Sequence, residues 1–244
     1  MAEPIADQTD VAAPRPISWG LGDAGLGFLL GVFGSIFASA LYFMATDSVD
    51  DDPPLSVLLL LQVPLWAGLL GIPLWAARTK GNGARTDFGL WMRPLDAPVG
   101  LAIGVALQLL VIPAIYYPLF RLTPLTSEDV SAPAEALASD ADGPLGVVLL
   151  VLLVVIGAPL AEEVFYRGLL LRSFARRGMG AASAVALTSV LFGLSHFLII
   201  QLPALLAFGL VAATLAERTD RLGPSVWAHV GFNATTVTAL LLTT

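Results

Sequence analysis

The sequence predicts an all-α protein, a polytopic bundle of about seven transmembrane helices. Of its 244 residues, 57% are hydrophobic and only 13% are charged, with a mean hydropathy of +0.82. A soluble domain is nearer a quarter charged, so this composition is typical of a membrane protein. The apolar residues also form long uninterrupted runs, as helices that span a bilayer require. The short alternating strands of a transmembrane β-barrel are not visible.

Six runs without Asp, Glu, Lys or Arg define the helices: 24–46, 53–77, 97–120, 143–161, 178–216 and 222–244. The run 178–216 is long enough for two spans, and Gln201–Pro203 is the natural turn between them. The sequence therefore predicts helices at 24–46, 54–77, 98–121, 144–176, 181–200, 203–217 and 223–243.

The remaining segments suggest one membrane domain with a short tail. Residues 1–22 are rich in Pro and Ala and lack a basic n-region and a cleavage pattern, so we expect a disordered cytoplasmic tail instead of a signal peptide. Residues 23–244 form the predicted transmembrane domain, and the motifs described below lie in 155–240. The chain contains no cysteine, which excludes disulfides, thiol catalysis and thiolate metal sites.

Charged residues alternate between the two sides of the predicted bundle. Basic residues follow the second, fourth and sixth helices: Arg78, Lys80, Arg85, Arg93, Arg172, Arg176, Arg177, Arg218 and Arg221. The segments 47–52 and 123–142 hold nine acidic residues and no basic one. The positive-inside rule then places the N-terminus in the cytoplasm and the acidic segments and the C-terminus outside the cell membrane.

Three predicted helices carry polar residues that are costly in apolar surroundings. In PLAEEVFYRGLLLRSF, residues 159–174, two glutamates are adjacent and an arginine follows. The fifth helix holds FGLSH and the seventh holds HVGFN, and their histidines are the only two in the chain. The candidate site residues are Glu162, Glu163, Arg167, Phe192, His196, His229 and Asn233. In each motif two of these residues are four positions apart and so share a helix face. Ionisable residues inside a membrane usually mark a functional site, so we expect one here.

Helix geometry allows these side chains to meet. At 1.5 Å per residue, Glu162 lies roughly 21 Å from Arg176, and His196 lies roughly 22 Å from the start of its helix. Asn233 lies about 15 Å from the start of the seventh helix, which places its pair a few ångströms nearer the cytoplasm. We therefore expect the three segments to converge near the middle of the membrane.

Each residue also has a plain structural interpretation. Glu163 and Arg167 suit a buried ion pair, and histidines in membrane helices often bond only to neighbouring helices. Phe192 suits a packing role. Ser195 is a poor nucleophile candidate. It is adjacent to His196 in the sequence, and adjacent residues point to different faces of a helix. No Gly-x-Ser-x-Gly frame surrounds it either.

Taken together, the candidate residues favour a catalytic site. With Arg167 assigned to Glu163, the carboxylate of Glu162 remains free, and beside an imidazole it can take a proton from water. A second imidazole and a carboxamide on one helix face can donate hydrogen bonds to a developing oxyanion. This is the outline of amide hydrolysis without a covalent intermediate.

The motifs EEVFYR, FGLSH and HVGFN resemble, in order and separation, the EExxxR, FxxxH and HxxxN motifs of the CPBP family of intramembrane glutamic endopeptidases. That family includes type II CAAX prenyl endopeptidases and bacteriocin-processing or self-immunity proteins. The resemblance implies that Glu162 activates water with help from His196. It also implies that His229 and Asn233 form the oxyanion hole, and that Glu163 with Arg167 braces the site.

The leading hypothesis is therefore a membrane endopeptidase without a cofactor that cuts a membrane-associated or lipid-modified peptide near the cytoplasmic side of the bilayer. One alternative is a protease that depends on zinc or another divalent metal, although HExxH is absent. Another alternative is a non-enzymatic immunity or peptide-binding protein. The expected partners are the lipid bilayer and the peptide substrate, with no nucleic acid.

Overall fold

Helices account for most of residues 15–46 and 53–242, which are the residues that the computed structural model describes. No strand occurs among them, and the predicted all-α helix bundle is confirmed. The first half of the chain contains α1 (Leu21–Thr46), α2 (Leu55–Trp66), η1 (Ala67–Gly71), α3 (Ile72–Lys80), α4 (Ala84–Asp87), α5 (Asp96–Ala106), η2 (Leu107–Val111), α6 (Ile112–Leu122) and α7 (Ser127–Ser139). The second half contains α8 (Gly143–Leu150), η3 (Val151–Gly157), α9 (Ala158–Glu162), η4 (Glu163–Leu170), α10 (Leu171–Arg176), α11 (Ala181–Leu194), α12 (Leu202–Thr219) and α13 (Gly223–Leu241).

Five of the helices in the described residues are long and apolar enough to cross a membrane: Leu21–Thr46, Leu55–Lys80, Asp96–Leu122, Gly143–Arg176 and Leu202–Thr219. The other two predicted spans do form helices. However, α11 has only 14 residues, and α13 is less apolar because it contains His229, Asn233 and several threonines. The chain is therefore a multi-pass membrane protein.

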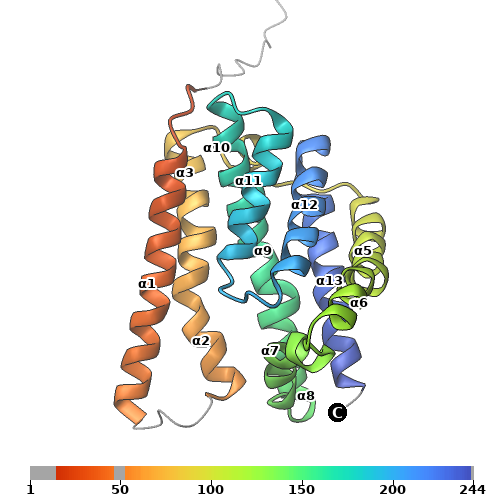
Figure 1. The fold of residues 1–244 in the computed structure, drawn as a ribbon. Coiled ribbons are helices and arrows are strands. Elements are labelled where there is room, and N and C mark those ends of the chain that lie inside the picture. Colours follow the sequence, from red (N-terminus) through yellow and green to blue (C-terminus); the bar gives the residue numbers. More distant parts are fainter. Residues whose placement is uncertain (1–14, 47–52, 243–244) are drawn as a thin grey trace, which may run out of the picture.

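The fifth predicted helix, 181–200, ends earlier than expected. In the structure α11 ends at Leu194, and Phe197 adopts a left-handed backbone with φ of 56°. A non-glycine residue in this conformation ends a helix. Fourteen residues rise only about 21 Å, so α11 and α12 form a hairpin whose turn lies partway down the bundle (Figure 1). His196 lies in this turn and not on a helix face, which corrects the prediction.

Helix α7 was not predicted, because its segment was assigned to an acidic external loop. Its N-terminus carries a capping box in which Thr126 and Asp129 bond each other's backbone N–H groups. Hydrogen bonds from Thr126 also hold the pKa of Asp129 below its usual range. Intermediate or buried positions at Val130, Ala134 and Leu137 give the helix one inward face.

The prediction of a disordered tail over residues 1–22 is wrong for its last part. Residues 1–14 lie outside the described residues, but Trp19 is only 3% exposed and packs edge-on against Phe88. Its Nε1 donates to Oδ2 of Asp87, and Arg176 lies over its ring. The described start of the chain is therefore fixed to the end of the bundle before α1 begins.

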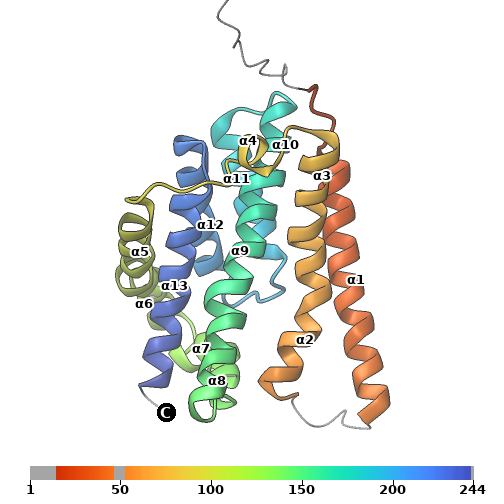
Figure 2. The same cartoon turned by 180° about the vertical axis from the view of Figure 1, so that it is seen from behind.

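The two ends of the bundle differ in charge, as the sequence predicts. The segments 81–95, 177–180 and 220–222 lie at the end that holds α3, α4 and α10, which we call the basic end. Helix α7 lies at the opposite end, near the start of α8 and the end of α13, and we call this the acidic end (Figure 1). Seen from behind, α9 lies between α13 and the α2–α3 segment (Figure 2), and it packs against both α13 and η1.

Two hydrophobic clusters hold the helices together. The larger lies toward the basic end and includes Phe88, Phe165 and Phe208, while the smaller lies toward the acidic end and includes Leu150 and Val237. Within the described part of the chain, four π-helical segments interrupt the long helices, and η3 and η4 lie on either side of the short helix α9 that ends at Glu162. Such segments often occur at functional sites, because the wider turn leaves backbone groups without their usual partners.

Candidate functional site

Glu162 lies between the two histidines of the chain. Its Oε2 is 3.9 Å from Nε2 of His196 and 3.9 Å from Nε2 of His229. This separation is too long for a direct hydrogen bond, and Oε2 has no hydrogen-bond partner among the described residues. The side chain of Glu162 is 17% exposed and that of His196 is 27% exposed, and both line a cavity, although Oε2 of Glu162 is itself buried. The predicted convergence of three segments is confirmed.

The other nitrogen of each ring is already bound. Nδ1 of His196 is 2.8 Å from the carbonyl oxygen of Phe192, which only accepts, so Nδ1 carries a hydrogen and donates it. Nδ1 of His229 likewise donates to Oε1 of Glu163 at 2.9 Å. Both rings therefore present Nε2 to Glu162, with a lone pair when the ring is neutral and a hydrogen when it is protonated.

Glu163 connects two helices. Its Oε1 accepts from Nη1 of Arg167 at 2.8 Å and from His229. The side chains of Glu163 and Arg167 are both 0% exposed. The pair is thus the predicted buried ion pair. Glu163 also orients His229. This second role of Glu163 was not predicted from the sequence.

Aromatic rings enclose the guanidinium of Arg167. Its Cζ lies 4.4 Å from the ring centroid of Phe192 and 5.5 Å from that of Phe208. The negative faces of such rings stabilise a buried cation. The ring of Phe192 is also 4.8 Å from that of His196, edge to face. Phe192 is therefore a packing residue, as predicted, and it packs on both the ion pair and the histidine.

The turn that carries His196 is held by hydrogen bonds from four other residues. Ser195 Oγ donates to the Phe192 carbonyl and accepts from the hydroxyl of Tyr166 at 2.6 Å. Tyr116 donates to the carbonyl of Ile200, and Gln201 donates to the carbonyl of Val130 in α7. Ser195 is therefore part of the support of the turn. The support from Tyr166 and Tyr116 could not be predicted from the sequence, because their partners lie far away in the chain. Gln201 was predicted only as part of the turn, without its bond to α7.

Asn233 occupies a different depth from the one predicted. Its Nδ2 donates to the carbonyl of Val154 at 2.8 Å. In a π-helix each carbonyl accepts from the N–H five residues later, as the Leu153 carbonyl accepts from Ala158. The carbonyl of Val154 would therefore accept from residue 159, but this residue is Pro159 and has no N–H. Val154 precedes Glu162 by eight residues, so Asn233 lies nearer the acidic end than Glu162. The prediction was wrong because it assumed that all three helices start at one level.

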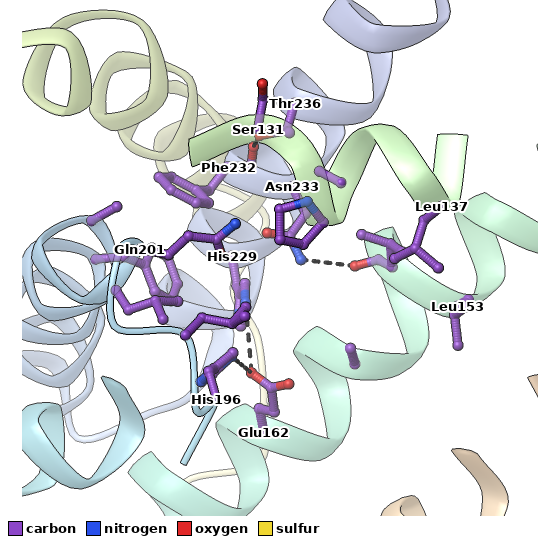
Figure 3. A pocket seen from close by; sticks show the side chains of 18 of the residues that line it. Ser131, Leu137, Leu153, Glu162, His196, Gln201, His229, Phe232, Asn233 and Thr236 are labelled. Atoms are coloured by element: carbon purple, nitrogen blue, oxygen red, sulfur yellow. Dashed lines mark hydrogen bonds and ion pairs between the residues drawn. The ribbon is translucent and has the colours of Figure 1, made fainter. Parts of the chain in front are cut away.

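A cavity of about 550 Å³ joins these groups. Glu162, Phe192, His196, His229 and Asn233 line it, whereas the fully buried Glu163 and Arg167 do not. Figure 3 shows Glu162, His196 and His229 together in the cavity, and Ser131 and Thr236 lie across it. Nδ2 of Asn233 makes one hydrogen bond within the described residues, and a carboxamide NH₂ group can donate two.

The described residues contain no group of three His, Cys, Asp or Glu side chains that could hold a metal ion. Glu162 and the two histidines are nevertheless suitable zinc ligands by type. A measurement of bound metal therefore distinguishes the two mechanisms.

Comparison with known proteins finds a match to a family model. The family model described as type II CAAX prenyl endopeptidase Rce1-like matches residues 144–235, which include all seven candidate residues. The resemblance that the three motifs indicated is thereby confirmed for this part of the chain. No curated protein and no solved structure is found to match the chain.

Proposed function

We propose that this chain is a membrane-embedded endopeptidase that hydrolyses a peptide bond with a water molecule activated by Glu162. The observation that carries the proposal is the position of Glu162 Oε2, which is 3.9 Å from Nε2 of both His196 and His229. The match to a protease family supports hydrolysis of peptide bonds in a membrane-associated substrate.

Glu162 and His196 are arranged to hold a water molecule by both of its hydrogens. The lone pair of His196 Nε2 and Oε2 of Glu162 are two acceptors, and a gap of 3.9 Å suits one water bonded to both. The water oxygen then attacks the carbonyl carbon of the substrate while Oε2 takes one proton. No covalent link to the protein forms in this step.

His229 and Asn233 would stabilise the oxyanion that forms on the carbonyl oxygen. For this role His229 must be protonated, with Nδ1–H given to Glu163 and Nε2–H given to the oxyanion. Glu163 accepts the Nδ1–H and so holds the ring in this orientation. Asn233 would contribute the Nδ2–H that the Val154 carbonyl does not use. The proton on Glu162 then passes to the leaving nitrogen as the C–N bond breaks.

The proposed location is the cell membrane, with the basic end in the cytoplasm. The arginines and Lys80 at that end support this orientation by the positive-inside rule. The substrate is a peptide held at or in the bilayer, with or without a lipid modification.

The proposal is tested by comparing the membrane peptidomes of cells that carry the wild-type protein and the Glu162→Ala variant. A functional protease yields peptides with new termini that are present only with the wild type. Identical peptidomes, together with full biological function of the variant, would favour the non-enzymatic alternative.

A further inference from the structure

We infer that the substrate peptide reaches Glu162 from the acidic end of the bundle, through the cavity beneath α7, and that the basic end is closed to it. The inference rests on the proposed proteolytic function, because it states from which side that site takes its substrate. It also changes the expected substrate, since the sequence suggested a cut near the cytoplasmic side.

The cavity extends in one direction from Glu162. Its lining includes Leu58 near the start of α2, Leu137 in α7, and Thr236 and Leu240 near the end of α13. Each of these positions lies on the acidic side of Glu162, as the course of the helices shows (Figure 1). None of the lining residues comes from the segments 81–95, 177–180 or 220–222 at the basic end.

The opposite direction is filled with side chains. Glu163 and Arg167 are 0% exposed, Phe192 and Phe208 are 1% exposed, and Leu222 is 0% exposed. These side chains form a close-packed layer between Glu162 and the basic end. A second cavity lies beside α1 and is lined by Leu21, Tyr166 and Phe197, but Glu162 and the two histidines are not part of its lining. The layer also keeps the ion pair dry, which strengthens its interaction with His229.

The part of the cavity toward the acidic end contains a polar side chain, Gln108, whose oxygen has no hydrogen-bond donor among the described residues. Gln108 lies in η2, within a run that is otherwise apolar, and it lines the cavity. Its buried Oε1 accepts no hydrogen bond among the described residues. A buried acceptor of this kind requires an explanation, and the N–H of a peptide main chain is a donor that fits it. The substrate would then lie in the cavity between Glu162 and Gln108.

Helix α7 forms the outer wall of this route. Ser131 and Leu137 line the cavity from α7, and Gln201 ties α7 to the turn that carries His196. A peptide that enters here approaches Glu162, in the middle of the bundle, from the acidic end. The substrate class is therefore a membrane peptide presented from the side opposite the arginine-rich segments.

The absence of cysteine from the chain allows a direct test. Single cysteines are introduced as Ser131→Cys and Thr236→Cys in the cavity, as Arg177→Cys at the exposed basic end, and as Ser189→Cys in the layer between them. Ser189 is 1% exposed and packs beside Gly209, whose carbonyl accepts from Arg167. The probe is a membrane-impermeant maleimide, added to vesicles of each orientation.

We expect Ser131→Cys and Thr236→Cys to react only from the side where Arg177→Cys does not, and Ser189→Cys to react from neither side. Labelled Thr236→Cys should lose at least nine-tenths of its cleavage activity. Labelling of the cavity cysteines from the same side as Arg177→Cys would overturn the inference, and so would full activity after labelling. If the unlabelled protein cleaved nothing, the proposed function would fail, while the labelling would still show from which end the cavity is reached.

Gln108→Leu gives a second and independent readout. Loss of one hydrogen bond to the substrate main chain should raise KM about 3- to 10-fold with kcat retained. The matched control is Leu109→Ala on the same helix, because Leu109 is 57% exposed on the outer surface. Equal KM values for both variants would show that the peptide does not contact Gln108.

Discussion

Nδ1 of His229 lies 2.9 Å from Oε1 of Glu163, so the second carboxylate of the adjacent pair binds the histidine of α13 as well as Arg167. This bond joins η4 to α13 in the middle of the bundle. It fixes the ring so that Nε2 points toward Glu162. The two glutamates therefore have separate tasks, one exposed to the cavity and one buried beneath it.

Glu163→Gln and Arg167→Ala should each lower the yield and the melting temperature of the purified protein. Breaking one side of a buried ion pair leaves an uncompensated charge, which costs on the order of 3–5 kcal/mol in soluble proteins. The double neutral variant should recover part of the loss. If Arg167→Ala were inactive but as stable as the wild type, Arg167 would belong to the chemistry instead of the support.

Asn233→Ala should lower kcat by roughly 10²–10³-fold with little change in KM, as loss of one oxyanion donor does in other enzymes. It should also lower the stability by about 1–3 kcal/mol, because the Val154 carbonyl loses its donor. Steady-state kinetics and thermal unfolding of the same preparation separate the two effects. A large rise in KM at constant kcat would make Asn233 a substrate-binding residue.

His229→Ala should lower kcat to a similar degree, and the double variant with Asn233→Ala should lose less than the product of the two effects. Both donors act on one oxygen atom, so their contributions are not independent. Metal content is measured in parallel. Activity that survives exhaustive chelation supports the water mechanism, whereas His229→Ala losing both activity and a bound metal would support the metal alternative.

Ser195→Ala should keep cleavage activity within about tenfold of the wild type. Ser195 supports the His196 turn through Tyr166 and the Phe192 carbonyl, and one such bond contributes about 0.5–1.5 kcal/mol. Tyr166→Phe, which removes the partner hydroxyl, is the matched control and should behave alike. A loss above about 10³-fold in Ser195→Ala alone would instead indicate a serine nucleophile.

The polar residues of the site could be found from the sequence because each is an exception in an apolar helix. Glu162 and His229 are visible for that reason, and the spacing of their helices allowed the convergence to be predicted. The end of α11 could not be found, since residues 197–200 are as apolar as a helix interior and the turn depends on bonds from Tyr116 and Gln201.

The bond from Asn233 to the Val154 carbonyl was also hidden. It depends on the π-helical register of η3 and on Pro159, neither of which can be read from apolar periodicity. Helix α7 was missed for a different reason. Its carboxylates suggested a solvated loop, although the capping box at Thr126 and Asp129 is a readable helix signal.

The most direct test of the account is the cleavage rate of Glu162→Gln, measured on a peptide found in the peptidome comparison. The substitution is nearly isosteric and removes the base while keeping the shape of the site. We expect a protein that unfolds at the wild-type temperature, with kcat lowered at least about 10²-fold. Residual activity above about a tenth of the wild type would contradict the assignment of Glu162 as the group that activates water.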